Sequence, residues 1–255
     1  MIKKHRKNKK NGDFIEIFGI HAVKAALNNK DRNHKELIIS EKLKHYFQDF
    51  IKNVDKKSVI PNIEFNKIYG SEKNHQGVIL ITTNIKQKNL EDILFNRKKN
   101  QIDLVIMLDQ ITDPQNIGSI IRSCSLFNCH SVIVSKKNSP DVTSSIIKAA
   151  SGALETINYI KVTNLHREIE KFKKHNYWVV GFDNNTNDSL THNQLPKKCL
   201  LIFGAENKGM RQLTKKACDQ ILKIPIKKNI KFKIDSLNVS NACAIAMYEH
   251  FKLYN

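Results

Sequence analysis

From position 102 onward, hydrophobic residues fall into short, nearly continuous runs separated by amphipathic segments. The runs are DLVIML (103–108), SVIVS (131–135), YWVVGF (177–182), CLLIFG (199–204) and ILKIPI (221–226). Such runs are typical of strands buried on both faces of a parallel sheet. Helical spacing of apolar positions occupies 116–127, 142–154, 165–175, 210–219 and the last segment, NVSNACAIAMYEHFKLY. The pattern predicts an α/β domain with a mostly parallel sheet.

The N-terminal part has a looser pattern that predicts a smaller α/β unit. We expect a helix over 17–29, a strand over 35–40, a helix over 42–54 and short strands over 63–70 and 77–83. A polar stretch with one short amphipathic turn follows and predicts a linker that carries a helix. The predicted organisation is a tail (1–12), a small unit (13–84), a linker (85–101) and a larger domain (102–255).

The charge of the chain limits the kinds of partner that it is expected to bind. A formal charge of +19, from 43 Lys and Arg against 24 Asp and Glu, favours a polyanion such as nucleic acid. An anionic membrane surface fits the same charge, but no apolar run approaches the roughly 20 residues of a membrane-spanning helix. The sequence therefore predicts an RNA or DNA partner and no membrane association.

Cysteine and histidine usage bears on compartment and metals. The five cysteines are Cys124, Cys129, Cys199, Cys218 and Cys243. They include no C-x-x-C pair, and most of them lie in apolar runs. The ten histidines are scattered and form no H-E-x-x-H pattern. We expect a cytoplasmic protein with reduced thiols and no metal site.

Three polar clusters each follow an apolar run, where α/β domains carry their functional loops. They are DPQNIGSIIR (113–122), GAENKG (204–209) and SLNVSN (236–241). No G-x-G-x-x-G is present, and the second cluster continues with Met210 and Arg211 where a phosphate-binding P-loop requires Lys and Ser or Thr. This argues against an ATPase and against a dinucleotide-dependent dehydrogenase.

The first cluster begins a helix in an unusual way. Asp113 and Pro114 are ordinary helix-starting residues, yet Gly118 follows within the first turns, at a cost of roughly 1 kcal/mol relative to alanine. On a helical wheel Arg122 points away from the apolar side around Ile117. Arg122 is therefore either a solvated helix arginine or a functional one, and Gly118 indicates a close approach by substrate or by another helix.

The three clusters resemble, in order, the motifs of the SpoU/TrmH family of RNA ribose 2′-O-methyltransferases. DPQNIGSIIRS resembles the first motif, LIFGAENKGM the second, and IPI followed by SLNVSNA the third. In the N-terminal half, FGIHAVKAAL and HQGV are similar to the ribosomal-protein-like substrate-binding domain of the RlmB type of enzyme. The resemblance implies a SPOUT α/β trefoil-knot catalytic domain, although chain knots are rare.

The resemblance also implies a function and partners. It implies S-adenosylmethionine as methyl donor, RNA as substrate and a homodimer with its site near the subunit interface. The N-terminal similarity favours a guanosine of 23S (large-subunit) rRNA. A tRNA guanosine methylase of the same family and a non-catalytic RNA-binding or ribosome-assembly factor remain alternatives.

Site residues follow by matching motif positions. The resemblance implies a cofactor pocket formed by Gly204, Ile224, Ile226, Leu237 and Asn238, and catalytic roles for Asn116, Arg122, Glu206 and Asn238. Plain core packing is the alternative for Ile224 and Leu237, and a solvated loop carboxylate is the alternative for Glu206. Asn238 and Ser240 open the last helix, so that capping and substrate contact are both open for them.

One segment departs from the family pattern. Between IPI and SLN the family has a short turn containing glycine, whereas KKNIKFKID (227–235) is longer, lacks glycine and carries four lysines. It is either a basic extension that touches RNA or a distortion that weakens cofactor binding.

The basic start of the chain, MIKKHRKNKKNGDF, predicts a disordered arm that either contacts RNA or only aids solubility. If residues 1–10 contact phosphates, their removal weakens RNA binding more at low salt than at high salt. Fluorescence anisotropy titrations of a labelled RNA at several salt concentrations measure this. An unchanged salt dependence in the truncated protein would show that the arm is incidental.

Overall fold

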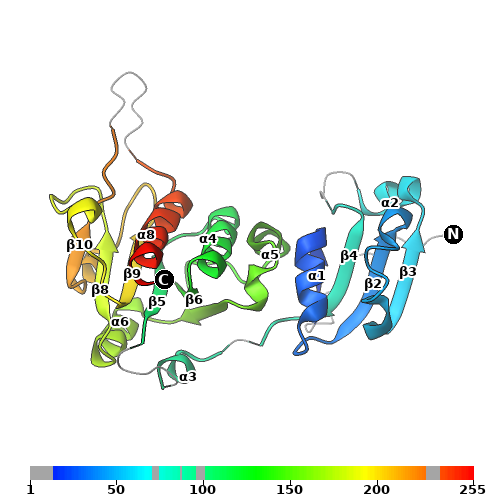
Figure 1. Ribbon diagram of the computed structural model, residues 1–255, viewed down its shortest axis with the longest axis horizontal. Helices are drawn as coiled ribbons and strands as arrows, with labels where there is room; N and C mark the ends of the chain where they lie inside the picture. Colours follow the sequence, from blue (N-terminus) through cyan, green and yellow to red (C-terminus); the bar gives the residue numbers. More distant parts are fainter. Residues whose placement is uncertain (1–13, 71–74, 87, 96–100, 228–235) are drawn as a thin grey trace. The chain divides into compact units, whose positions relative to one another are not determined.

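The computed structural model describes residues 14–70, 75–86, 88–95, 101–227 and 236–255, which divide between two compact units, Met1–Lys86 and Gln87–Asn255 (Figure 1). The predicted tail, part of the predicted linker and nearly all of the lysine-rich loop lie outside the described residues. Each unit is described by itself below.

The first unit is a four-stranded sheet with helices. β1 (Phe14–Phe18), β4 (Val78–Thr83), β2 (His34–Ser40) and β3 (Lys56–Ile60) lie in the order β1-β4-β2-β3. β4 is antiparallel to both of its neighbours, and β2 and β3 are parallel. α1 (Ile20–Asn28) contacts β1 and β4, while α2 (Asn62–Tyr69) buries Phe65 against Ile38 and Ile79.

Some of the elements predicted for this unit were wrong. Residues 63–70 form α2, not a strand, because Phe65 and Tyr69 lie one turn apart and share one core, and Gly70 ends the helix with φ 78°. The predicted helix over 42–54 is instead two short 3₁₀ turns, η1 (Glu41–Leu43) and η2 (Ile51–Asn53), with further turns between them. Backbone hydrogen bonds there mix i→i−3 and i→i−4 spacing around the buried Phe47. Ile17 belongs to β1, so the first helix begins only at Ile20.

The second unit carries a parallel sheet, as predicted, with six strands where the sequence pattern predicted five. Its strands are β5 (Asp103–Asp109), β6 (Cys129–Ser135), β7 (Asn158–Val162), β8 (Trp178–Phe182), β9 (Lys198–Gly204) and β10 (Gln220–Leu222), in the order β10-β8-β9-β5-β6-β7. β5 and β9 are neighbours in the middle, and the chain leaves β5 toward β6 but leaves β9 toward β10. Such a switch in direction opens a crevice at the carboxyl ends of the two strands.

Helices cover both faces of this sheet (Figure 1). α3 (Leu90–Phe95) and α6 (Leu165–Lys174) join the core on one face. α4 (Pro114–Leu126) contacts α5 (Ser144–Ala150) and α8 (Val239–Tyr254), which places these helices together. α8 follows the edge strand β10 in sequence yet contacts the central strand β9, so the end of the chain returns to the middle of the sheet. The trefoil knot stays a prediction.

Element boundaries in this unit differ from the sequence pattern in a few places. The pattern missed β7, because Asn158 and Lys161 interrupt NYIKV and leave no continuous apolar run in this edge strand. The run 221–226 is strand only as far as Leu222. The helix predicted over 142–154 stops at Ala150 and resumes as the 3₁₀ turn η3 (Ala153–Glu155), since Ser151 and Gly152 both adopt positive φ. α7 covers only Gln212–Lys216, and a further 3₁₀ turn, η4 (Leu190–His192), precedes β9.

The structure explains the glycine in the first turns of α4. A Cβ added at Gly118 lies 2.4 Å from Ala149 Cβ and 2.8 Å from the carbonyl oxygen of Ile146, both on α5. Asp113 caps α4 as predicted and accepts hydrogen bonds from the N–H groups of Gln115 (3.0 Å) and Asn116 (3.4 Å). The close approach at Gly118 is therefore to another helix of the same chain, and α4 is fixed there by packing.

Replacing Gly118 by alanine tests this packing. Alanine is the better helix former, but the overpacked methyl group costs about 1–3 kcal/mol, so Gly118→Ala lowers the stability of the second unit. Urea denaturation followed by the fluorescence of Trp178, the only tryptophan and a residue of β8, reports on this unit. Ser119→Ala on the same turn is the control, with a change within about 0.5 kcal/mol. A more stable Gly118→Ala protein would contradict the argument.

Candidate active site

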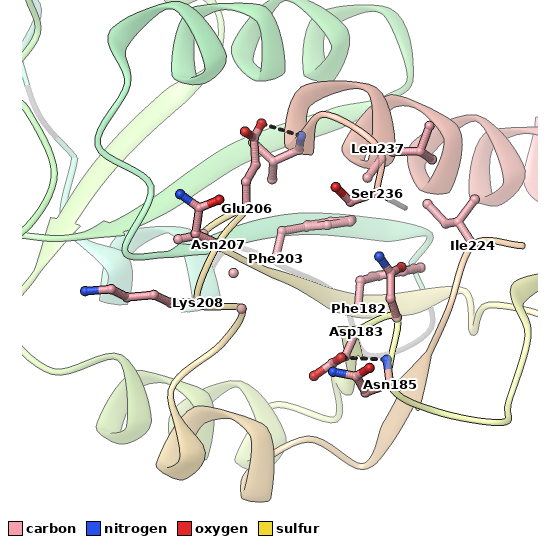
Figure 2. A pocket seen from close by; sticks show the side chains of 16 residues that line it. Phe182, Asp183, Asn185, Phe203, Glu206, Asn207, Lys208, Ile224, Ser236 and Leu237 are labelled. Carbon is pink, nitrogen blue, oxygen red and sulfur yellow. Dashed lines mark hydrogen bonds between the residues drawn. The ribbon is translucent and has the colours of Figure 1, made fainter. Parts of the chain in front are cut away.

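A cavity of about 270 Å³ lies at the carboxyl ends of β8 and β9, beside the start of α8 (Figure 2). Its floor is the turn that follows β9, and its walls come from the ends of β8 and β10 and from the chain just before α8. The lining comprises Phe182, Asp183, Asn184, Asn185, Phe203, Gly204, Ala205, Glu206, Asn207, Lys208, Gly209, Ile224, Ser236, Leu237, Val239 and Ala242. The second and third sequence motifs therefore meet at one cavity.

Hydrogen bonds join all three motifs beside this cavity. The side-chain amide nitrogen of Asn238, Nδ2, donates to Glu206 Oε1 at 2.8 Å and to Asn116 Oδ1 at 3.0 Å. Glu206 Oε1 also accepts from the N–H of Val239 at 3.1 Å (Figure 2). The carboxylate therefore satisfies a free N–H at the positive end of α8.

Asn238 has a structural role as well. Its Oδ1 accepts from the N–H of Ser240 at 2.9 Å and from the hydroxyl of Ser240 at 2.5 Å. Asn238 is thus the N-cap of α8, as one of the two sequence interpretations held. Its amide nitrogen serves the contact with the other two motifs, so one side chain both starts the helix and positions Asn116 and Glu206.

The turn after β9 requires glycine at its first position. A Cβ on Gly204 lies 2.1 Å from the carbonyl carbon of Gly209 and 2.2 Å from the nitrogen of Met210. Ala205 and Gly209 are bridged across the turn, where the N–H of Gly209 donates to the carbonyl of Ala205 at 2.7 Å. Gly209 itself has φ 62°. Any side chain at Gly204 displaces this backbone, which forms the floor of the cavity.

An ion pair between a buried carboxylate and an exposed arginine fixes the turn to the neighbouring strand. Asp109, the fully buried last residue of β5, accepts from the backbone N–H of Arg211 at 2.9 Å and from its Nε at 2.8 Å. A buried carboxylate needs such a partner, and removal of one member leaves an uncompensated charge. The loops after β5 and β9 are thereby locked together.

Sequence reasoning missed the aromatic wall and the acidic residue of the cavity. Phe182 and Phe203 stack with ring centroids 4.6 Å apart and planes 4° apart, at matched positions of β8 and β9. Asp183 follows Phe182 and accepts from Lys215 Nζ at 2.6 Å and from the N–H of Asn185 at 2.8 Å. The signal in the sequence was an acidic residue directly after a buried strand, as in the motifs that were noticed.

The Asp183 carboxyl is held ionised. Burial opposes its ionisation, but the hydrogen bonds from Lys215 and from the Asn185 backbone outweigh burial and hold the pKa of Asp183 below its ordinary value. Asp183 thus adds negative charge to one end of a cavity whose other exposed charges include Glu206 and Lys208.

The remaining predicted site residues are placed as follows. Ile224 and Leu237 line the cavity, half-buried, while Ile226 is half-buried outside the lining. Arg122 is exposed on α4 and lines neither this cavity nor the second cavity described in the next paragraph. Its guanidinium has no hydrogen bond or ion pair to another described residue. The structure therefore unites Asn116, Glu206 and Asn238 and leaves Arg122 on the outer side of α4.

A second cavity, of about 500 Å³, adjoins the first. The two share Ala205, Glu206, Asn207, Lys208 and Val239. The second cavity adds residues that follow β5 and β6, namely Gln110, Ile111, Thr112, Asp113, Asn116 and Asn138. The hydrogen-bonded set of Asn116, Glu206 and Asn238 thus lies at the boundary between two cavities.

Over the described residues, no cluster of metal-ligating side chains and no membrane-spanning helix was found.

Comparison with known families agrees with this geometry. Residues 103–248 match the model of the SpoU rRNA methylase family, and residues 17–103 match the model for RNA 2′-O ribose methyltransferase substrate binding. This chain belongs to the SpoU rRNA methylase family. The family match covers the sheet, both cavities and the start of α8.

Individual relatives cover nearly the whole chain. The 23S rRNA (guanosine-2′-O-)-methyltransferase RlmB of Salmonella typhimurium is 32% identical over 238 residues, which are 91% of this chain and 96% of that protein. A putative TrmH family tRNA/rRNA methyltransferase of Staphylococcus epidermidis is 31% identical over 93% of this chain and 95% of its own length. The SpoU methyltransferase AviRb of Streptomyces viridochromogenes, solved with AdoMet, has a TM-score of 0.77 at 19% identity and covers 95% of this chain and 90% of its own. The last likeness shows the fold.

The lowered pKa of Asp183 can be tested by measuring protein stability at different pH values. Because its pKa is lowered from 3.8 in the folded state, Asp183 contributes stability that is present above that ordinary value and is lost as the pH falls through the lower folded value. Asp183→Asn therefore destabilises the second unit at pH 7 by about 0.5–1 kcal/mol, the range of a partly exposed ion pair, and the difference shrinks below about pH 4. Urea denaturation by Trp178 fluorescence at several pH values measures it. A difference that stays constant down to pH 3 would contradict the lowered pKa.

Proposed function

We propose that this chain transfers a methyl group from S-adenosylmethionine to the ribose 2′-hydroxyl of a guanosine in 23S rRNA. The observation that carries the proposal is the hydrogen-bonded set of Asn116, Glu206 and Asn238, which joins the three motifs between two cavities. Membership of the SpoU family supports the reaction, and the names of the RlmB relatives support the substrate.

The first cavity suits the methyl donor. Its floor is the backbone turn after β9, which Gly204 allows to close on itself, so that main-chain groups line the cavity. Ile224 and Leu237 offer apolar surface for an adenine ring, and Asp183 and the nearby amides offer hydrogen-bond partners for polar groups. When bound, the donor supplies an electrophilic methyl group on a sulfonium.

The residues of the chain orient the acceptor and stabilise charge. Glu206, held by Asn238 and by the N–H of Val239, places a fixed carboxylate at the boundary of the two cavities. Asn116 presents its amide at the same boundary. A guanidinium remains protonated, so Arg122 of a second copy, reaching the site across the interface proposed below, holds a neighbouring phosphate and stabilises the alkoxide that develops on the ribose, rather than acting as the base.

A homodimer accounts for the position of Arg122. Arg122 and Leu126 lie one turn apart on α4, and Leu126 is 65% exposed. Ile245 and Tyr248 are exposed on α8, and Tyr248 packs edge-on against Phe127 at the end of α4. The outer faces of the two helices thus form an apolar surface with Arg122 on it. We propose that a second copy of the chain covers this surface and that Arg122 lies at the interface.

Alternatives of two kinds differ in what they require. A tRNA substrate is supported by the name of the Staphylococcus epidermidis relative, a putative TrmH family tRNA/rRNA methyltransferase. A non-catalytic RNA-binding or assembly factor has no need of a donor pocket, so S-adenosylmethionine binding distinguishes it from the enzymes.

The five cysteines are free thiols, and cytoplasmic localisation is part of the proposal.

Methyl transfer from labelled S-adenosylmethionine to RNA from cells that lack this protein tests the proposal. We expect label in large-subunit rRNA with the wild-type protein. Arg122→Ala lowers the rate by a factor of about 100 or more, as expected when one preorganised donor to a developing oxyanion is lost, and leaves S-adenosylmethionine binding nearly unchanged.

Arg167→Ala is the charge-matched control, because it removes an exposed arginine from α6, on the other side of the sheet. An equal loss in both variants would show a general effect of charge on RNA binding. Label in tRNA would favour the first alternative. No label from a dimeric, donor-binding protein would count against the enzyme, and loss of donor binding together with folding in Arg122→Ala would make the residue structural.

A further inference from the structure

The second cavity has the position and size of a nucleotide site. Its volume of about 500 Å³ lies within the roughly 300–1,000 Å³ of small-molecule pockets. It shares Glu206 with the first cavity and contains Asn116, so a ribose at the shared wall is next to both residues. The rest of the lining, formed by the loops after β5 and β6, lies where an attached base has room.

One of these loops holds a residue in an uncommon conformation. Gln110 has φ 65°, in the left-handed region that residues other than glycine rarely adopt. It stands between the fully buried Asp109, which is ion-paired with Arg211, and the nearly buried Ile111. Backbone strain of this kind persists only where neighbours hold it, and it is often found at ligand sites.

The other loop carries Asn138 and is firmly held. Its own N–H donates to the hydroxyl of Ser135 at 3.3 Å. The next residue, Ser139, donates its hydroxyl to the carbonyl of Ile111 at 3.5 Å and accepts at its own carbonyl from Lys161 Nζ at 3.0 Å. The loops of Gln110 and Asn138 are therefore tied to each other.

The amide groups on these two fixed loops are available. Within the described residues, neither the Gln110 nor the Asn138 side chain makes a hydrogen bond to another protein group, although both residues are half-buried in the cavity lining. Asp113 also lines the cavity, but its two carboxylate oxygens accept from N–H groups at the start of α4. Half-buried amides without partners are expected to bind a ligand or water.

We propose that this cavity receives the base of the target nucleotide and that Gln110 and Asn138 are its specificity-determining residues. A primary amide pairs with the lactam edge of guanine, its oxygen accepting from N1–H and its NH₂ donating to O6. Lys208, which lines the same cavity and has donors only, pairs with the acceptors O6 and N7. Adenine carries a donor where guanine has O6, so a lysine and an amide NH₂ that both face this position select guanine over adenine. This inference rests on the proposed methyl transfer.

The experiment uses an RNA fragment around the nucleotide that the wild-type protein methylates, made with guanosine or adenosine at that position. Asn138→Leu and Gln110→Met keep side-chain size and remove the amide. Each lowers kcat/KM on the guanosine fragment by roughly 10- to 100-fold, as expected when the edge of a bound base loses its partner, and reduces the preference for guanosine over adenosine. Gln194→Met, an exposed glutamine that lines neither cavity, is the matched control and changes neither quantity.

Binding of S-adenosylmethionine by calorimetry shows whether each variant keeps its folded donor site. Normal donor binding with a reduced guanosine preference supports the inference. Normal donor binding with an unchanged preference for guanosine overturns it, whether kcat/KM is kept or is lost equally on both fragments. If the wild-type protein transfers no methyl group to cellular RNA, no such fragment can be chosen and the proposed function fails instead, so the two failures are distinguishable.

Discussion

The carboxylate of Glu206 is the contact on which the site depends. It accepts from the Asn238 side chain and from the first N–H of α8, and it thereby fixes the start of the last helix against the turn after β9. Asn238 in turn reaches Asn116, at the start of α4. Segments more than 120 residues apart in the chain are brought together by one hydrogen-bonded set. Because Glu206 Oε1, Asn116 Oδ1 and both side-chain polar atoms of Asn238 have defined partners, the geometry at the boundary of the two cavities is set by the helix ends themselves.

Close backbone approach is the second constraint, and glycine provides it in two places. Gly204 allows the turn after β9 to fold back on its own backbone, and Gly118 allows α4 to lie against α5. The first shapes the floor of the first cavity, and the second fixes the helix that carries Asn116 and Arg122. The helix propensity lost at Gly118 is therefore offset by packing, and the missing side chain of Gly204 allows the turn to close on its own backbone.

The catalytic half could be predicted well from the sequence, because buried parallel strands leave continuous apolar runs and the three motifs follow them. β7 was missed because Asn158 and Lys161 interrupt its short apolar sequence, and α2 was mistaken for a strand because only Phe65 of that short helix is fully buried. Pairwise contacts between distant loops leave no local pattern. The stacking of Phe182 on Phe203, the Asp109–Arg211 pair and the held loop of Asn138 could not have been derived from spacing.

The order of the strands sets the relative positions of the two cavities. The first cavity lies above β8 and β9, and the second cavity lies above β9, β5 and β6, so the two follow each other along the carboxyl edge in strand order. Both share the turn after β9, which Gly204 shapes and Arg211 ties to Asp109. A methyl group and its acceptor would therefore meet across a single rigid turn. The switch between β5 and β9 thus supplies both the crevice and the alignment that an in-line transfer requires.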